Sequence, residues 1–210
     1  MFNTDDFILR KRGFLSEESC RRIINFFEKN PDRQKEACTV DGVIDSSHRK
    51  YTEMIVESTF SEQVFNLIHL ELKSSKDEYK NRYPILDDMC YSWDIYPTFK
   101  IQKYEPSEGY FTLHCENDGH VGRMDDIHRR LLAWMIYLND VNDDGYTEFP
   151  YQKKKFQPRR GDLLIWPAYF THPHRGITSK TETKYILTGW YWFLNKWDRS
   201  NVPDNIKIFT

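Results

Sequence analysis

The chain has 210 residues, enough for one domain that buries about 70% of its unfolded surface around a single core. Its net charge of −2 provides no electrostatic footprint for nucleic acid or an anionic membrane, so we expect neither as a partner. Aromatic residues make up 16% of the chain and include six tryptophans, which favours a β-rich core or a cleft lined with rings.

The expected compartment is the cytoplasm. No apolar segment follows Met1, and no run approaches the roughly 18 apolar residues of a membrane span, so we expect neither a signal peptide nor a transmembrane helix. The four cysteines have no close pairing pattern, which is typical of reduced thiols. They are Cys20, Cys38, Cys90 and Cys115.

The first elements in chain order are a short strand and a helix. Phe7-Ile8-Leu9 predicts an edge strand. Ser16 is a good N-cap, and the helix that follows ends at Asn30-Pro31. Apolar residues repeat along it with helical spacing. They are Cys20, Ile23, Ile24 and Phe27.

A polar stretch and a second helix come next. Residues 31–56 are mixed in character and suggest a small hairpin or loop around Asp41-Gly42. The apolar stripe from Phe60 to Ile68 predicts a helix over residues 58–74, with an exposed charged continuation to Arg82. We therefore assign residues 1–85 to a helical N-terminal support region.

From residue 89 the pattern changes to short aromatic or β-branched runs separated by turn residues. Eight or so strands at this spacing predict an antiparallel sandwich or jelly roll over residues 89–195, and hence a mostly β chain with N-terminal helices (α+β). The predicted strands are Met89–Trp93, Thr98–Tyr104, Gly109–His114, Arg130–Leu138, Tyr146–Phe149, Lys155–Gln157, Asp162–Trp166, Gly176–Thr178 and Tyr185–Trp192.

A histidine and a carboxylate stand two positions apart at His114 and Glu116. In an extended strand both project from the same face, and together they supply two of the three protein ligands of a two-His-one-carboxylate Fe(II) site. The numbers of histidine and acidic residues in the chain predict about one such His-x-acid pair by chance, and the chain has two. The other pair, His69 and Glu71, falls in a helical pattern where positions i and i+2 diverge, so we interpret it as two surface residues.

A second histidine ligand has two candidates, His172 and His174, which follow a buried strand and Pro167. They are again two positions apart, and either could point inward depending on the register. The other histidines that we compared with them, His48, His120 and His128, fall in polar connections and are interpreted as loop residues.

Residues 98–193 resemble the Fe(II)/2-oxoglutarate-dependent dioxygenases, and among them the prolyl 4-hydroxylase-like group. The family's motifs occur in the family's order. They are Gly109 to Glu116, Tyr137-Leu138-Asn139, Gly145-Tyr146-Thr147-Glu148-Phe149-Pro150, Pro158 to Pro167, and His174 followed by Lys184 and Trp190.

The resemblance implies a double-stranded β-helix and a set of site residues. The metal ligands would be His114, Glu116 and His174, because the family pairs its distal histidine with a basic residue about ten positions on. His174 has Lys184 at that distance, whereas His172 has the acidic Glu182.

Lys184 would bind the distal carboxylate of 2-oxoglutarate. Tyr104 and Tyr137 match tyrosines near that cosubstrate, and Thr188 matches a hydroxyl near its carboxylate. For these last three, ordinary core or strand positions remain an alternative. Glu116 departs from the family, which more often has Asp there.

The implied function is hydroxylation of an unactivated C–H bond, with Fe(II), 2-oxoglutarate and O2 as cofactors and ascorbate as a further candidate. Succinate and CO2 would be the co-products, and a prolyl, peptidyl or amino-acid group the substrate. Two alternatives remain at this point. One is a cupin-like metalloprotein that uses His172 and His174 without 2-oxoglutarate, and the other is a jelly-roll binding module without a metal.

Overall fold

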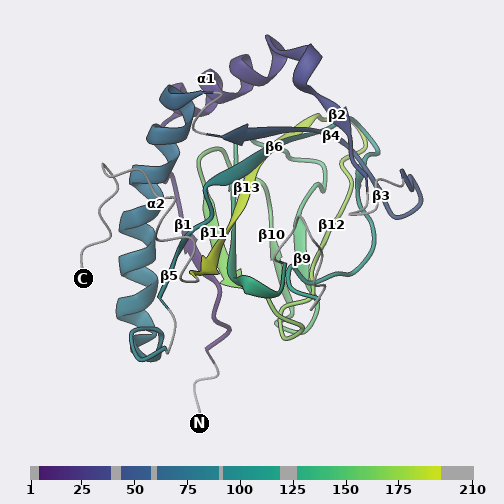
Figure 1. The fold of residues 1–210 in the computed structure, drawn as a ribbon. Coiled ribbons are helices and arrows are strands. Elements are labelled where there is room, and N and C mark those ends of the chain that lie inside the picture. Colours follow the sequence, from purple (N-terminus) through teal and green to yellow (C-terminus); the bar gives the residue numbers. More distant parts are fainter. Residues whose placement is uncertain (1–4, 39–43, 58–60, 90–91, 119–126, 195–210) are drawn as a thin grey trace.

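The structure is a computed structural model that describes residues 5–38, 44–57, 61–89, 92–118 and 127–194. The hairpin expected around Asp41-Gly42, His120 and Cys90 lie outside these ranges. A large antiparallel sheet runs through the molecule with α1 and α2 on one of its faces, as Figure 1 shows, and two smaller sheets lie on the other face. This is the predicted jelly-roll architecture, and the α+β fold class is confirmed.

The helices are α1 (Glu17–Glu28) and α2 (Glu62–Arg82), with short 3-10 turns at Pro31–Arg33, Pro84–Leu86 and Ile127–Arg129. The strands of the large sheet are β1 (Leu9–Lys11), β11 (Leu163–Pro167), β8 (Arg130–Tyr137), β13 (Lys184–Phe193), β6 (Thr98–Tyr104), β4 (Thr52–Glu57) and β2 (Lys35–Glu36), in that spatial order, with β5 (Trp93–Ile95) also paired to β13. The smaller sheets are β10 (Lys154–Phe156), β9 (Thr147–Phe149) and β12 (Arg175–Gly176), and β3 (Arg49–Lys50) with β7 (Gly109–Tyr110).

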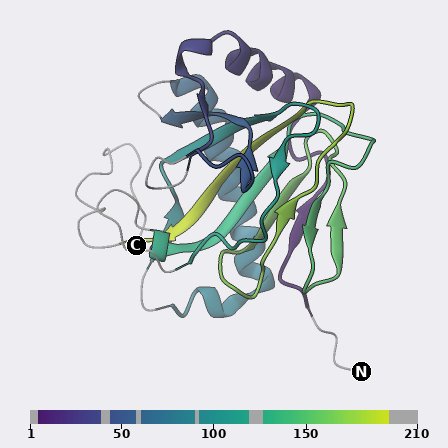
Figure 2. The ribbon, with the colours of Figure 1, turned by 90° about the vertical axis from the view of Figure 1, so that its right-hand side faces the viewer.

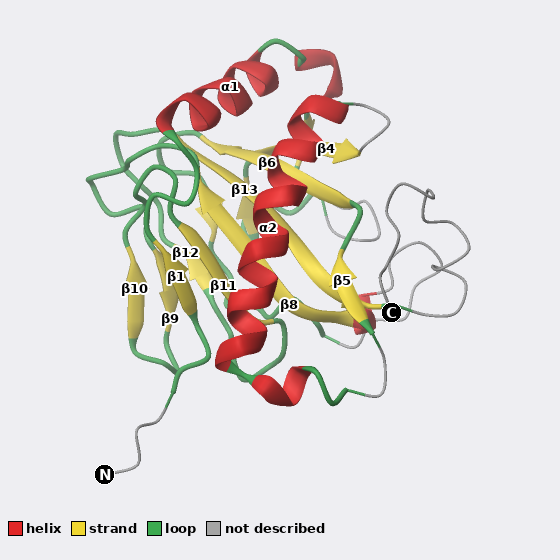
Figure 3. Cartoon of the chain, turned by 90° about the vertical axis from the view of Figure 1, so that its left-hand side faces the viewer, coloured by secondary structure: helices red, strands yellow, loops and turns green. Residues whose placement is uncertain are grey.

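Both helices begin where a serine satisfies the first free backbone N–H groups. Ser16 accepts from the N–H of Ser19, and Ser61 accepts from the N–H of Val64. Cys20, Ile23 and Phe27 of α1 are buried on the sheet side, as their spacing predicted. Figure 3 shows both helices lying across the large sheet, so they cover the face opposite the smaller strands.

Alternation along the strands separates the large sheet into two chemically different faces. On β13, Leu187 and Tyr191 join the apolar cluster under the helices, whereas Ile186 and Trp190 join a second cluster on the opposite face. Gly189 lies opposite Trp134 across β8 and β13, and an added Cβ there would come within 2.5 Å of the indole ring, so the close fit requires glycine. Figure 2 shows the opposite side, where the smaller strands cover the second face.

Two sequence predictions need correction. β4 was not predicted as a strand, and with β1 and β2 it brings residues from the predicted helical region 1–85 into the large sheet. The strand predicted from Gly109 to His114 ends at Tyr110, and His114 forms only an isolated bridge. The charged continuation predicted after residue 74 belongs to the same helix, which ends at Arg82. These differences arise from pairing and packing partners that are distant in sequence, which a local pattern does not show.

His69 also differs from its expected surface position. Its ring stacks on Phe65 of α2, and both ring nitrogens are buried without a hydrogen-bond partner among the described residues. Burial lowers the pKa of His69 and so favours the neutral imidazole. It lies on the helix face of the molecule, and Glu71 beside it is exposed as predicted.

Candidate metal centre and cosubstrate cavity

Two histidines from distant parts of the sequence are paired through their backbones. His114 N donates to His174 O at 3.0 Å, and His174 N donates to His114 O at 2.8 Å. This two-residue bridge holds the chain after β7 against the chain before β12 on the second face of the large sheet. It therefore fixes the separation of the two imidazole rings without a regular strand at His114.

The second ring nitrogen of each histidine is committed to the backbone. His114 Nδ1 lies 3.0 Å from Thr112 O, and His174 Nδ1 lies 3.1 Å from His172 O. Because a carbonyl oxygen only accepts, each Nδ1 must carry the proton, and each Nε2 keeps a free lone pair. This is the tautomer that a metal-binding histidine needs.

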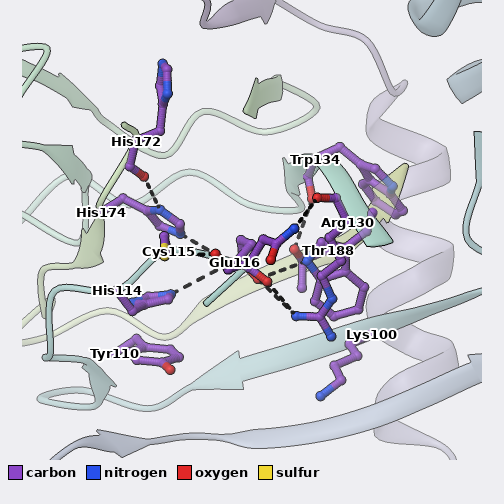
Figure 4. Close-up of polar contacts among 12 residues, drawn as sticks. Lys100, Tyr110, His114, Cys115, Glu116, Arg130, Trp134, His172, His174 and Thr188 are labelled. Carbon is purple, nitrogen blue, oxygen red and sulfur yellow. Dashed lines mark hydrogen bonds and ion pairs between the residues drawn. The ribbon is translucent and has the colours of Figure 1, made fainter. Parts of the chain in front are cut away.

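The free nitrogens face one carboxylate. Glu116 Oε1 lies 3.7 Å from His114 Nε2 and 3.3 Å from His174 Nε2. One ligand atom from each of the three residues lies within 4.8 Å of the others, and no further group of this kind occurs within the described ranges. Figure 4 shows both imidazoles converging on Glu116.

The electrostatics of the cluster suit a cation. Burial disfavours the charge of Glu116, but His114 and His174 in their protonated form donate to it and carry positive charge, which outweighs burial and holds the carboxyl pKa well below its usual range. Burial, followed by the neighbouring charge of His174, lowers the pKa of His114. An ionised carboxylate next to a neutral imidazole is the protonation state in which both act as ligands.

Aromatic rings fix the orientation of the two imidazoles. Tyr110 stacks on His114 with ring centroids 3.6 Å apart, and Phe149 stacks on His174 at 5.3 Å. Trp166 meets His174 edge-on at 5.0 Å. Rigid neighbours of this kind hold the ligand atoms in place before a metal binds.

The other oxygen of Glu116 is held from the opposite side. Trp190 Nε1 donates to Glu116 Oε2 at 2.9 Å. Arg130 donates from Nη1 to the backbone oxygen of Glu116 at 3.1 Å, and the same Nη1 lies 3.7 Å from Oε2. The guanidinium of Arg130 lies 3.7 Å above the Trp190 ring, so the two side chains form one packed unit.

His172 does not join this cluster. Its Nε2 is 2.8 Å from Asp6 O, and its Nδ1 is 2.9 Å from the hydroxyl of Thr171. Figure 4 shows its ring directed away from Glu116. The ring thus anchors the N-terminal segment, and the cupin-like arrangement that needs both His172 and His174 is not favoured.

A cavity of about 810 Å³ opens beside the three residues. Residues of β13, β6 and β4 line it together with the loops that contain His114 and His174. Those that the following argument uses are Tyr104, Thr147, Trp166, Lys184, Thr188 and Trp190.

Lys184 lies buried in this cavity wall, with only 4% of its surface exposed. Its Nζ donates to Gly145 O at 3.0 Å and lies 4.7 Å from the ring centroid of Tyr104. No carboxylate is paired with it among the described residues, and burial lowers its pKa to about 8. An anion entering the cavity would supply the missing counter-charge.

The other three predicted cosubstrate residues have different surroundings. Tyr104 lines the cavity and donates to Gln102 Oε1 at 2.8 Å. Thr188 lines it too, with its hydroxyl donating to Trp134 O at 3.0 Å. Tyr137 is fully buried behind the wall, with its hydroxyl 2.7 Å from Thr147 Oγ1 and 3.0 Å from Phe156 O. It reaches the cavity through Thr147 and does not line it.

Sequence reasoning missed Tyr110, Arg130 and Trp166 as site residues. Trp166 has an indole N–H that is buried without a hydrogen-bond partner in the described part of the chain, although the residue lines the cavity. Tyr110, four positions before His114, could have been found from its place in the first motif. Arg130 has no local signal, because it comes 14 residues after Glu116 and is brought to it by tertiary contacts such as the hydrogen bond from the Asn117 side-chain amide to the backbone oxygen of Arg130.

The donor set fits Fe(II). Two neutral imidazoles and one carboxylate, with solvent-sized space beside them, form the facial set that non-haem Fe(II) oxygenases use. The unpaired cation of Lys184 in the same cavity fits a dicarboxylate cosubstrate that reaches from the metal to the ammonium group.

Comparisons with known proteins agree with this geometry. Residues 99–192 match the family model of the 2OG-Fe(II) oxygenase superfamily. A putative prolyl 4-hydroxylase of Acanthamoeba polyphaga mimivirus is 26% identical over 124 residues, and prolyl 4-hydroxylase 13 of Arabidopsis thaliana is 23% identical over 127 residues. The matched regions cover 51% and 53% of this chain, and the chain spans about half the length of these relatives, 51% and 46%.

Solved structures of prolyl hydroxylases share the fold. A Pseudomonas putida prolyl-4-hydroxylase matches with a TM-score of 0.69 and 15% identity, covering 90% of this chain and 93% of that one. A viral collagen prolyl hydroxylase from Paramecium bursaria chlorella virus 1, in complex with 2-oxoglutarate, matches with a TM-score of 0.63 and 20% identity, covering 88% and 95%. The match over residues 99–192 confirms the resemblance inferred from the sequence, and the family of that model uses Fe(II), 2-oxoglutarate and O2. The solved structures confirm the fold.

No helix in the described ranges is both long and apolar enough to cross a membrane.

Proposed function

We propose, from the premise that residues 99–192 carry a 2OG-Fe(II) oxygenase domain, that this protein hydroxylates an unactivated C–H bond of a prolyl, peptidyl or amino-acid substrate. The observation that carries the proposal is the convergence of His114 Nε2, Glu116 Oε1 and His174 Nε2 beside a cavity that contains the buried cation of Lys184. Bound Fe(II) with 2-oxoglutarate and O2 would supply the oxidising chemistry, with succinate and CO2 as co-products.

The chain's own residues would bind and orient the reactants. His114, Glu116 and His174 would hold the metal on one side, which leaves the cavity side for cosubstrate and O2. Lys184 would pair with the distal carboxylate of 2-oxoglutarate, and the low polarity of its surroundings would strengthen that charge-assisted contact. Tyr104 and Thr188 would line the cosubstrate, and Tyr137 would act through Thr147.

The proposed reaction needs no general acid or base from the protein. The protonated Nδ1 atoms of both histidines are engaged by backbone carbonyls and hold the rings in one tautomer. The protein's contribution is therefore positioning and exclusion of water from the cavity.

The substrate part of the proposal rests on the relatives. A prolyl hydroxylase of Trichoplax adhaerens, solved with a peptide fragment of a hypoxia-inducible factor, has the same fold, with a TM-score of 0.62 and 19% identity over 96% of this chain and 89% of that one. The basic residues Lys154, Lys155 and Arg160 are each paired with an acidic residue, Asp6, Glu148 and Glu17, which lowers the cationic charge that they offer to nucleic acid.

Incubation with Fe(II), ascorbate and 2-oxoglutarate tests this function through succinate release. Proline-rich peptides and free amino acids are then compared with single- and double-stranded oligonucleotides, each scored by the mass gain of one oxygen atom. The expected result is hydroxylation of a peptide or amino acid. Oxidation of an oligonucleotide with all peptides inert would refute the substrate class, and no succinate under any condition would refute the activity.

Two further assignments belong to this proposal. We infer that residues 1–210 act as one domain, because β1, β2 and β4 share a sheet with the strands of the C-terminal half. A cytoplasmic location is supported by Cys20, Cys38 and Cys115, which are free thiols.

A further inference from the structure

The two oxygens of the Glu116 carboxylate have different partners. Oε1 faces both histidine nitrogens, whereas Oε2 accepts from the indole N–H of Trp190 and lies near Arg130. Figure 4 shows Arg130 approaching Glu116 from the side opposite the imidazoles. One oxygen is thus directed to the metal position, and the other is held away from it.

This division matters because Glu116 stands where related enzymes more often have aspartate. Glutamate has one more rotatable bond, and an unrestrained carboxylate could offer both oxygens to a metal or swing aside. Oε2 is held by a 2.9 Å hydrogen bond from a ring that is itself packed under the Arg130 guanidinium. Charge-assisted hydrogen bonds of this kind contribute more than neutral ones.

Neither member of the pair is free to move independently. Trp190 lies within β13, opposite Ala133 of β8, and Tyr96 packs edge-on against its ring at a centroid distance of 6.2 Å. Arg130 begins β8, lies opposite Trp192, and also donates to the backbone oxygen of Glu116. The pair therefore fixes both the main chain and the side chain of this ligand.

We propose that Trp190 and Arg130 are positioning residues that restrict Glu116 to single-oxygen coordination, and that this restraint is what allows glutamate to serve at this position. The inference rests on the proposed metal centre and goes beyond it, because it assigns a function to two residues that bind neither metal nor cosubstrate. An aspartate at position 116 would be shorter by one carbon–carbon bond, about 1.5 Å, and could not reach the indole while keeping its metal contact.

Metal-free protein is titrated with Co(II), a spectroscopic substitute for Fe(II), and the affinity and visible spectrum of the bound ion are recorded. Trp190→Phe keeps the ring but removes the donor, and should weaken Co(II) binding on the order of 10-fold and alter the spectrum. The matched control is Trp192→Phe, two positions along the same strand, where the indole packs on Arg129 and Tyr96. It should change affinity by less than about 2-fold.

A double-mutant cycle separates positioning from general packing. In the Glu116→Asp background, Trp190→Phe should change Co(II) affinity by less than about 2-fold, because the bond it removes is already lost. Arg130→Gln provides a second variant, with an effect in the same direction as Trp190→Phe. Circular dichroism of each variant checks that the fold is retained.

Two results would overturn the inference while the metal centre stands. One is a Trp190→Phe variant that binds Co(II) like Trp192→Phe with an unchanged spectrum. The other is an equal effect of Trp190→Phe in the wild-type and Glu116→Asp backgrounds. If the His174→Ala variant still binds Co(II) with the affinity of the wild type, the proposed metal centre is refuted, and the inference with it.

Discussion

The two faces of the large sheet are made by alternating residues of the same strands, yet they serve different purposes. On β13 the residues that face the helices, such as Leu187 and Tyr191, belong to a continuous apolar cluster. The residues that alternate with them, Lys184, Thr188 and Trp190, line the cavity. The backbone is shared, so neighbouring positions differ only in which side of the sheet they reach.

Alternate residues of the same strand therefore contribute either to the stability of the fold or to the binding site. The helix face is covered by α1 and α2, and large rings such as Trp134 are fully buried there. The cavity face contains a buried lysine without a paired carboxylate in the described ranges, and a carboxylate held between two histidines. Such groups cost stability in the free protein and are retained where a ligand compensates for them.

The largest effect is expected from His174→Ala on the cavity face. Removing one of three ligands should reduce Fe(II) affinity by at least about 100-fold, while the melting temperature of the metal-free protein changes little. Metal content after equilibrium dialysis measures the first, and thermal unfolding the second. A variant that retains Fe(II) at wild-type affinity would contradict the assignment of His174.

Lys184→Met should separate cosubstrate binding from metal binding. Loss of the cation leaves the distal carboxylate of 2-oxoglutarate buried without a partner, which costs on the order of 3–5 kcal/mol, or roughly 100- to 4000-fold in affinity. Fe(II) affinity should stay near the wild-type value. Calorimetric titration of both ligands checks this, and an unchanged 2-oxoglutarate dissociation constant would sink the role of Lys184.

Leu187→Ala tests the helix face of the same strand. Leu187 is fully buried, so the cavity left behind should lower the free energy of unfolding by about 2–5 kcal/mol. Affinities of the folded fraction for Fe(II) and 2-oxoglutarate should be unchanged. The control is Thr188→Ala, which removes one hydrogen bond and should cost only about 1 kcal/mol of stability. If denaturant unfolding shows a larger loss in the free energy of unfolding for Thr188→Ala than for Leu187→Ala, the prediction is contradicted.

The smallest expected effect is a pH dependence of the apo protein. Burial lowers the Lys184 pKa to about 8, below that of a lysine in the unfolded chain. Above about pH 8 the unfolded state therefore binds more protons at this residue, and its contribution to the free energy of unfolding rises with pH toward about 10.5.

The same titration should weaken 2-oxoglutarate binding as the pH rises, since a neutral amine offers no counter-charge. Lys184→Arg is the control, because a guanidinium stays charged over this pH range. Its affinity for 2-oxoglutarate, whatever its absolute value, should not depend on pH. Dissociation constants measured between about pH 7 and 9.5 compare the two proteins. A wild-type affinity that is flat over this range, or parallel slopes for both proteins, would contradict the prediction.

Much of the fold could be predicted because its signals are local. The β6 strand has the predicted bounds, and Ser16 caps α1 as its position in the sequence indicates. β4 was missed because its alternation includes Glu53, which reads as a surface residue. In the structure Glu53 is buried through pairs with Lys100 of β6 and Lys35 of β2, partners that only the sheet brings together.

The site shows the same limit. The resemblance to a known family selected His174 over His172, and periodicity alone left both open. The structure supplies a physical reason for the difference, since the ring of His172 is hydrogen-bonded to the backbone oxygen of Asp6, more than a hundred residues earlier. Arg130 could not be found at all from local sequence, because its contact with Glu116 depends on tertiary hydrogen bonds around Asn117.

Iron stoichiometry in a matched pair of variants tests the central claim most directly. Wild-type protein, His172→Ala and His174→Ala are loaded anaerobically with Fe(II), and 2-oxoglutarate binding is then measured with and without the metal. We expect one Fe(II) per chain and metal-dependent 2-oxoglutarate binding for the wild type and His172→Ala, and loss of both in His174→Ala. Full metal occupancy in His174→Ala, with loss in His172→Ala, would contradict this claim.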